Sequence, residues 1–425
     1  MYKSLKGKKL LVIGSDSSNI SIVEEAQDMG VYVVVTDGIT DITKAPAKKA
    51  ADEYWNIDYS DIDAIAKKCT ESNINGVFAG YSEFRVMAAC KIAKRLGLPF
   101  YANEEQIDLT RNKRKFKDAC SKYGIPIPKD YCFSYPMNED DKKSIEYPVI
   151  VKPADYAGRK GISVCNNLEE LNVAVEYAAK MSQSKTIIVE DYLNGLEFSS
   201  VYTAKNGEIS LSCVNEKYIT DDQDVKTGLC EFLISPAKSL DRYKKELDNK
   251  VRSFMEGIQI KNGVIFFQGM VTENKIYIFE MGYRINGNND FRVIDKINGI
   301  NFMKMMIAYS LCGDMCDDIA KDNPNYNKFA CTLLFYAHAG VINKFEVGNI
   351  YNNPNISDVV ERAWIGREIS EDGSTGQSVL TLKIFADTLE EVIETIKFAQ
   401  TNIIVEDEKG NNILFKPFDA KKLVK

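Results

Sequence analysis

A strand, a helix and a second strand follow one another at the start of the chain, and this order restricts the fold more than any other feature. The run KKLLVIGSDSSNISIVEEAQDMGVYVVVTDG places two short apolar strands around an amphipathic helix, which is the pattern of a βαβ unit. The run INGVFAGYSEFRVMAACKIAKRLGLPFYAN repeats the theme with a strand, a loop carrying Glu83 and a helix closing at Gly97. We therefore predict an N-terminal α/β domain with a parallel sheet over residues 1–108.

The turn after the first strand argues against a dinucleotide cofactor. It reads Gly14-Ser-Asp-Ser-Ser-Asn and lacks the GxGxxG spacing that lets the backbone approach a pyrophosphate.

Composition excludes several classes of partner. The chain has 425 residues, 45% of them hydrophobic, and a net charge of −7 with no segment that gathers the basic residues, so we expect no nucleic-acid partner. No apolar stretch approaches the ~20 residues of a membrane span, and the run from Leu10 to Ile13 is too short for a signal peptide. The 10 cysteines lack CxxC pairs. We predict a cytoplasmic protein with reduced thiols and no membrane partner.

The segment VIVKPADYAGRKG presents Lys152 between a strand and a glycine-containing loop. An ammonium beside Gly158 and Gly161 suits phosphate binding, because glycine lets backbone N–H groups come close to oxygen. A solvated lysine in a surface loop would give the same pattern. The loop is not a Walker A motif.

Glu190 ends the apolar strand of IIVEDYLNGLEFS, and Glu197 follows beyond a turn. The two carboxylates could accept from the N–H and O–H donors of an adenosine. They could equally be charged residues at the exposed ends of a hairpin.

Gln268 and Glu280 lie inside apolar strands, where a carboxylate needs a counter-charge or a metal ion. With a loop of three or five residues they would fall opposite each other on one face, whereas a two-residue turn would place Gln268 opposite Phe279. Facing oxygen ligands of this kind can hold Mg²⁺ while nucleotide phosphates complete the coordination. Arg284 would then stabilise negative charge on a phosphorylated intermediate. The alternative is a buried Glu–Arg ion pair.

Taken in order, these features resemble the ATP-grasp superfamily over nearly the whole chain. The features are Lys113 at a helix start, Lys152 before a glycine loop, the hinge VEDYLNGLEF, and a Gln/Glu strand pair followed by arginine. The resemblance implies an α/β and α+β protein: an N-terminal parallel-sheet domain, a two-part ATP-grasp clamp over residues 109–324 with a lid at about 148–208, and a small C-terminal α+β domain over 325–425.

The resemblance also implies roles for individual residues. Gln268 and Glu280 would bind Mg²⁺, with Mn²⁺ as an alternative, and Arg284 and Lys152 would be catalytic. Glu83, Asn288 and Arg292 are candidate substrate contacts. The residues that would contact ATP are Lys113, Lys152, Tyr156, Ala157, Gly158, Gly161, Glu190, Asp191, Tyr192, Leu193, Glu197 and Lys226.

One position departs from the family. Members commonly read Glu-x-Asn-x-Arg after the last strand, with asparagine as a further Mg²⁺ ligand, whereas this chain reads Glu280-Met-Gly282-Tyr-Arg284. Water, a bidentate Glu280, Asn286 or Asn288 could replace the missing amide. The number of metal ions therefore stays open.

The function implied is that of an ATP-dependent carboxylate–amine ligase that works through an acyl phosphate, with an amino acid as the leading carboxylate. Its partners would be ATP, a small carboxylate and an amine, and a homodimer is left open. Two rival interpretations are an enzyme similar to glycinamide ribonucleotide synthetase and one similar to a carboxylase. A third is a nucleotide-binding protein without catalysis, which is suggested by Gly282 in place of the usual asparagine. The sequence does not name the substrates.

Overall fold

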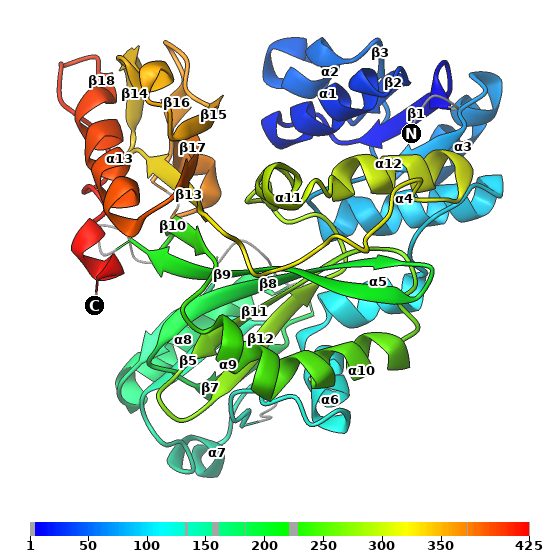
Figure 1. Ribbon diagram of the computed structural model, residues 1–425. Coiled ribbons are helices and arrows are strands. Elements are labelled where there is room, and N and C mark those ends of the chain that lie inside the picture. Colours follow the sequence, from blue (N-terminus) through cyan, green and yellow to red (C-terminus); the bar gives the residue numbers. More distant parts are fainter. Residues whose placement is uncertain are drawn as a thin grey trace.

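The N-terminal sheet of the computed structural model consists of parallel strands in the order β3-β2-β1-β4, with helices on both faces (Figure 1). The structure describes residues 5–131, 135–154, 161–182, 184–220, 228–371 and 373–424. The parallel α/β arrangement predicted for this end of the chain is confirmed. The elements are β1 (Lys9–Ile13), α1 (Ile20–Asp28), β2 (Tyr32–Thr36), α2 (Pro46–Ala50), β3 (Glu53–Trp55), α3 (Ile62–Glu71), β4 (Gly76–Phe78) and α4 (Glu83–Leu96).

A helix from much later in the chain also packs against the N-terminal sheet. α12 (Phe302–Cys312) is apolar almost all round and nearly all of its side chains are buried, as expected of a helix enclosed on every side. It lies against β4, where a Cβ at Gly76 would overlap the carbonyl group of Ser310. α11 (Asp290–Asn298) precedes it and lies between the N-terminal sheet and the C-terminal strands (Figure 1).

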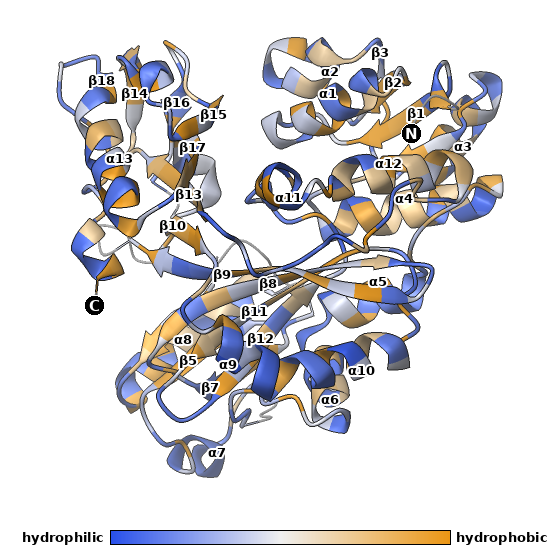
Figure 2. Ribbon diagram, viewed as in Figure 1, coloured by the Kyte–Doolittle hydropathy of each residue, from blue (hydrophilic) through white to orange (hydrophobic). Residues whose placement is uncertain are grey.

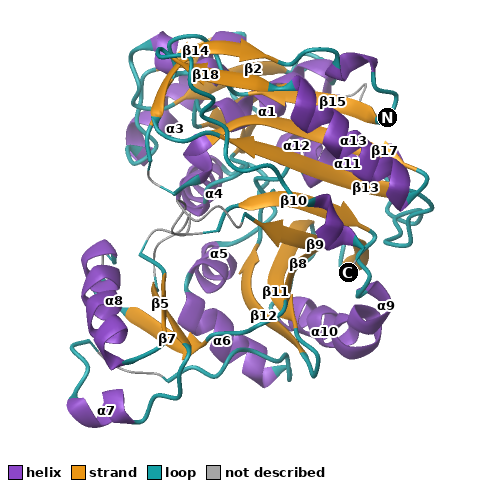
Figure 3. Cartoon of the chain, turned by 90° about the vertical axis from the view of Figure 1, so that its left-hand side faces the viewer, coloured by secondary structure: helices purple, strands orange, loops and turns teal. Residues whose placement is uncertain are grey.

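A small antiparallel sheet in the order β6-β5-β7 stands apart from the larger sheets, with α8 packed on one face (Figure 3). Asn167 caps α8 by accepting a hydrogen bond from the backbone N–H of Glu170. The elements leading into and forming this part are α5 (Glu104–Arg111), α6 (Lys113–Lys122), α7 (Glu139–Lys143), β5 (Val149–Pro153), β6 (Ser163–Cys165), α8 (Leu168–Met181) and β7 (Ile187–Asp191).

The central sheet runs in the order β12-β11-β8-β9-β10-β13-β17-β15. Asn206 and Gly207 form the two-residue turn between β8 and β9, both with positive φ, as the Asn-Gly pair predicts. The elements are β8 (Leu196–Lys205), β9 (Glu208–Ile219), β10 (Cys230–Ser235), α9 (Leu240–Tyr243), a π-helical turn (Lys244–Asp248), α10 (Asn249–Gly257), β11 (Gly263–Val271) and β12 (Ile276–Gly282).

The C-terminal strands continue this sheet, because β13 pairs with β10 across the predicted domain boundary at residue 325. The boundaries of the three predicted domains therefore stay a prediction. α13 covers one face of β13 and β17 over a separate apolar core. The elements are β13 (Phe329–Tyr336), β14 (Gly340–Glu346), β15 (Ile356–Glu361), β16 (Glu368–Ile369), β17 (Ser378–Ala386), α13 (Leu389–Asn402) and β18 (Ile404–Asp407).

Apolar residues are concentrated in the strands and in the helix faces that cover them (Figure 2). In Figure 2, β1 is apolar along its length, whereas α10 is mainly hydrophilic and faces outward. No described helix is long and apolar enough to cross a membrane. Every cysteine within the described ranges is a free thiol.

Candidate active site

Two buried lysines and a glutamate meet where the small sheet faces α6. Lys152 and Glu190 project from the same face of this sheet, because Glu190 lies opposite Ile150, two residues before Lys152. Oε1 of Glu190 accepts from Lys152, and Oε2 accepts from Lys117 on α6. Lys117 also donates to Oδ2 of Asp130 at 2.9 Å. Lys152 is 6% exposed and Glu190 is 2% exposed, so these charges depend on one another rather than on water.

The charges of this cluster shift one another's pKa values. Burial lowers the pKa of Lys152, and the charges of Lys117 and Lys113 act in the same direction against the opposing effect of Glu190. Burial alone would raise the pKa of Glu190, but Lys152 and Lys117 outweigh it and hold this pKa below its usual value. Several lysines thus crowd around one buried glutamate. A polyanion bound here would relieve their mutual repulsion.

Lys117 is a site residue that the sequence interpretation missed. It lies four residues after Lys113, which begins α6 as predicted. Residues at this spacing lie on one face of a helix. The spacing of Lys113 and Lys117 could therefore have identified Lys117 from the sequence.

The predicted adenine hinge begins in the last residues of β7 and continues beyond the strand. The backbone N–H groups of Asp191 and Tyr192 donate to the carbonyl oxygens of Lys129 and Pro148 at 3.0 and 3.1 Å, which fixes the path of the chain here. The Asp191 carboxylate accepts from Tyr131 at 3.1 Å. Leu193 is half-buried and Tyr192 is exposed. Contact between this hinge and adenine stays a prediction.

Glu197, the predicted ribose ligand, lies on β8 opposite Lys217 on β9. Its carboxylate forms an ion pair with Lys217 at 2.7 Å, and both side chains are mostly buried. The proposed contact between Glu197 and a ribose stays a prediction.

Part of the predicted nucleotide site falls on residues outside the described ranges. These residues are Tyr156, Ala157, Gly158 and Lys226. Gly161 is described and has a φ of +80°, a backbone conformation that favours glycine.

Gln268 and Glu280 face each other across β11 and β12. The turn is an even one, with Val271 opposite Ile276 and Thr272 N–H donating to Lys275, which alone would have placed Gln268 opposite Phe279. A β-bulge at Phe279 shifts the register by one residue. The predicted facing is therefore present, although the bulge rather than an odd loop produces it.

This pair begins a row of polar side chains across the sheet. Gln268 lies opposite Ser199 on β8, and Ser199 lies opposite Asn215 on β9. Asn215 accepts from Ser235 on β10 and donates to Asp290 at the start of α11 at 3.3 Å. The row leads from the Gln268–Glu280 pair to the loop that ends in α11.

The Gln268–Glu280 pair fits part of a Mg²⁺ site. Two protein oxygen ligands, with water and substrate phosphates at the other positions, are a usual arrangement for this ion. Gly282 supplies no third ligand, and a Cβ there would overlap the ring of Phe266. Among the described residues no group of three His, Cys, Asp or Glu side chains forms a closed metal site. The described residues thus suit a metal held jointly with a phosphate-bearing ligand.

Arg284 pairs with Glu83 of the N-terminal domain. Its Nε donates to Glu83 Oε1 at 2.6 Å, and one terminal nitrogen donates to the Ile285 carbonyl at 2.9 Å. The guanidinium lies 5.1 Å from the centre of the Phe266 ring. Arg284 therefore forms an ion pair, as the alternative interpretation expected. Its partner is Glu83, from near the start of the chain, and not Glu280.

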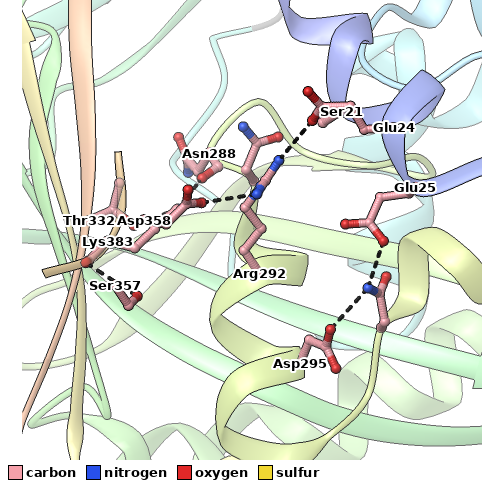
Figure 4. A network of polar contacts seen from close by, with 12 residues as sticks. Ser21, Glu24, Glu25, Asn288, Arg292, Asp295, Thr332, Ser357, Asp358 and Lys383 are labelled. Atoms are coloured by element: carbon pink, nitrogen blue, oxygen red, sulfur yellow. Dashed lines mark hydrogen bonds and ion pairs between the residues drawn. The ribbon is translucent and has the colours of Figure 1, made fainter. Parts of the chain in front are cut away.

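The other predicted substrate residues lie around α11 (Figure 4). The carbonyl of Asn288 accepts from Lys383 on β17 at 2.6 Å. Arg292 lies between Asp358 on β15, at 3.2 Å, and Glu24 on α1, at 3.6 Å. These contacts join the N-terminal, central and C-terminal parts of the chain at one junction.

The geometry agrees with a known domain family. Residues 145–290 match the model described as ATP-grasp domain. The chain contains an ATP-grasp domain. The match begins just before β5 and ends at the start of α11, so it includes Lys152, Glu190, Gln268 and Glu280.

The relatives found by sequence comparison are enzymes by name. A formate-dependent phosphoribosylglycinamide formyltransferase of Prochlorococcus marinus subsp. pastoris is 29% identical over 272 residues, which cover 61% of this chain and 66% of that protein. A phosphoribosylamine–glycine ligase of Fusobacterium nucleatum is 24% identical over 69% of this chain and 72% of its own length. The chain thus spans about two thirds of the length of these relatives.

Solved structures extend the likeness beyond the ATP-grasp domain. An L-amino acid ligase from Bacillus licheniformis superposes with a TM-score of 0.78 and 16% identity, over 95% of this chain and 99% of that one. A phosphoribosylglycinamide synthetase from Anaerococcus prevotii gives 0.75 and 18%, over 95% and 100%. At these identities the likeness establishes the fold. It confirms the predicted ATP-grasp architecture.

Proposed function

We propose that this chain is an ATP-dependent carboxylate–amine ligase. The observation that carries the proposal is the facing of Gln268 and Glu280 next to the lysine cluster, since Phe279, the neighbour of Glu280, has its ring 5.9 Å from Lys152 Nζ. Oxygen ligands and ammonium groups side by side suit a nucleotide whose phosphates carry a divalent metal ion.

In the proposed reaction an oxygen of the substrate carboxylate attacks the γ-phosphorus of ATP, the bond to ADP breaks, and an acyl phosphate forms. An amine then attacks the acyl carbon, phosphate leaves, and the amine loses a proton. Mg²⁺ held by Gln268 and Glu280 would neutralise charge on the transferred group. Lys152, Lys117 and Lys113 would orient the phosphates, because phosphoryl transfer depends mainly on positioning and charge neutralisation.

Arg284 is proposed to face the acyl phosphate. Its ion pair with Glu83 and its contact with the Phe266 ring hold the guanidinium in one orientation. A fixed cation of this kind stabilises developing negative charge without reorganising during the reaction. Glu190 is proposed to hold the lysines together before nucleotide binds, in addition to its predicted place beside adenine.

The finer assignments belong to the same proposal. We propose a cytoplasmic enzyme with the predicted hinge, Glu197 and glycine loop around ATP, and with the three domains bounded near residues 108 and 324. The carboxylate is proposed to be an amino acid or another small acid. A second candidate, a nucleotide-binding protein without catalysis, is favoured by the Phe266 ring that fills the space beside Gly282.

The test is ADP release over a panel of amino acids, with hydroxylamine present to trap an acyl phosphate as hydroxamate. The proposal predicts a hydroxamate with at least one acid, and its loss in Glu280→Ala. Glu273→Ala is the matched control, because Glu273 is exposed in the turn of the same hairpin and should leave turnover unchanged. Tight ATP binding without hydroxamate from any acid would instead favour the non-catalytic candidate.

A further inference from the structure

Two cysteine thiols lie in contact at the end of α12. The Sγ atoms of Cys312 and Cys316 are 3.7 Å apart, which is about the contact distance of two sulfur atoms that are not bonded. Cys312 is exposed and Cys316 is half-buried. Six of the other described cysteines are buried, and Cys230 is half-buried. The pair thus combines a neighbouring thiol with access from solvent.

The loop between the two cysteines folds back on the end of the helix. Gly313 ends α12 with a φ of +74°, a conformation that favours glycine at this position. The Asp314 carboxylate then accepts from the backbone N–H of Cys316 at 3.0 Å. Cys316 itself has a φ of +58°, which is uncommon for a residue other than glycine. These features return Cys316 to Cys312 within a short stretch of chain.

Contacts with two other parts of the chain hold the loop on both sides. Lys8, just before β1, donates to the Leu311 carbonyl at 2.9 Å. Lys205, at the end of β8, donates to the Asp317 carbonyl. Because both flanks of the cysteine pair are fixed to the rest of the protein, the contact between the sulfurs is a property of the folded chain.

Little movement is needed to join the two sulfurs. The S–S distance in a disulfide is about 2.05 Å, so each sulfur would move by roughly 0.8 Å from the present contact. In a reducing compartment, disulfides are rare, and those that form are usually transient and respond to the redox state. An exposed pair of thiols in contact suits such a transient bond.

The environments of the two thiols differ. Burial raises the pKa of Cys316 to about 11, and the hydrogen bond with Cys312 acts in the same direction, whereas the charge of Lys205 opposes them. Since the thiolate is the reactive form, Cys316 alone reacts slowly at neutral pH. Cys312, which is exposed, is the thiol that an oxidant reaches first.

We propose that Cys312 and Cys316 form a site of reversible oxidation, at which a small disulfide such as glutathione disulfide converts the two thiols to an intramolecular disulfide. The Cys312 thiolate attacks one sulfur of glutathione disulfide, the S–S bond of that molecule breaks, and one glutathione leaves. Cys316 then loses its proton and its sulfur attacks Cys312 Sγ, so the second glutathione leaves. The two departing thiolates take up the protons that the cysteines lost.

The overall change oxidises two protein thiols and reduces one glutathione disulfide to two glutathione molecules. Reduced glutathione in excess reverses it by the same exchange. The proposal is independent of the proposed ligase function, because its test requires no substrate and no turnover.

The test treats the whole folded chain with glutathione disulfide, then unfolds it and labels the remaining thiols with N-ethylmaleimide. Both cysteines fall in one tryptic peptide, residues 305–321, because this stretch has no lysine or arginine before Lys321. By mass spectrometry we expect this peptide to lose two hydrogen atoms and to carry neither maleimide nor glutathione. Reduction with dithiothreitol before labelling should restore a maleimide on each cysteine.

Single substitutions separate the roles of the two thiols. Cys316→Ser should stop at the mixed disulfide and keep glutathione on Cys312. Cys312→Ser should leave Cys316 with its maleimide label. Cys230→Ser is the matched control, since Cys230 is also half-buried, and its peptide 305–321 should oxidise like that of the unsubstituted chain. Equal melting temperatures of the reduced variants show that the fold is retained.

A comparison with the isolated peptide 305–321 tests the contribution of the fold. If the fold holds the sulfurs in contact, the folded chain should reach half oxidation at about tenfold less glutathione disulfide than the peptide, at the same concentration of reduced glutathione. An equal or higher requirement in the folded chain overturns the proposal. So does a folded chain whose peptide keeps both maleimide labels, or one that retains glutathione on Cys312 without forming the disulfide.

Discussion

Replacing Glu190 by glutamine tests whether the lysine cluster is held together as the structure shows. The substitution keeps the size of the side chain and removes its charge. Lys152 and Lys117 both donate to this carboxylate and both are buried. Without the negative charge, two ammonium groups remain close together in a site with little water to screen them.

The expected cost follows from the burial of the pair. Removing one partner of a buried ion pair typically destabilises a protein by about 3–5 kcal/mol. The entropy of unfolding is about 2.1 cal/mol/K per residue, which for 425 residues gives roughly 0.9 kcal/mol/K. If the chain unfolds in one transition, we expect the melting temperature to fall by about 3–6 °C.

The assay is thermal denaturation followed by circular dichroism, with and without MgADP. Glu169→Gln is the matched control, since Glu169 is exposed on α8, which packs on the same small sheet. MgADP should stabilise Glu190→Gln at least as much as the unsubstituted chain, because the phosphates replace the missing negative charge. A melting temperature equal to that of the control, or complete loss of the MgADP effect, would refute this account of the cluster.

Two further predictions concern the space beside Gly282 and the buried Lys383. Gly282→Asn should cost about 1–3 kcal/mol by overpacking against Phe266. Combining it with Phe266→Ala should destabilise less than the sum of the single changes; additive melting shifts would contradict the overlap. The pKa of Lys383 is lowered to about 8 from 10.5, so as pH rises between these values the folded chain releases this proton before the unfolded chain does. Its contribution to the free energy of unfolding should therefore increase with pH by up to about 3 kcal/mol. The melting temperature of the unsubstituted chain should rise relative to Lys383→Met between pH 8 and 10, and a constant difference would argue against the shift.

Local patterns predicted most of the elements. Gly97 ends α4 and Lys113 begins α6 as expected, because each of these signals acts over a few residues. The facing of Gln268 and Glu280 was predicted as one of two registers. The bulge at Phe279 that decides between them depends on packing between strands, which the spacing does not reveal.

Contacts between distant segments could not be predicted from spacing. Arg284 meets Glu83 across 201 positions of sequence, and Lys383 reaches the Asn288 carbonyl across 95. The continuation of the central sheet from β10 into β13 likewise joins segments assigned to separate domains. Lys117 could have been predicted from the sequence, since its spacing from Lys113 places both residues on one helix face.

The central claim is that the chain activates a carboxylate by phosphorylating it. The most direct measurement uses a substrate acid labelled with ¹⁸O in its carboxylate, together with ATP, Mg²⁺ and an amine, and determines the label in the released phosphate by mass spectrometry. An acyl phosphate mechanism transfers one carboxylate oxygen to phosphate, so labelled phosphate should appear in step with ADP. Release of ADP with unlabelled phosphate while the acid is consumed would contradict the claim.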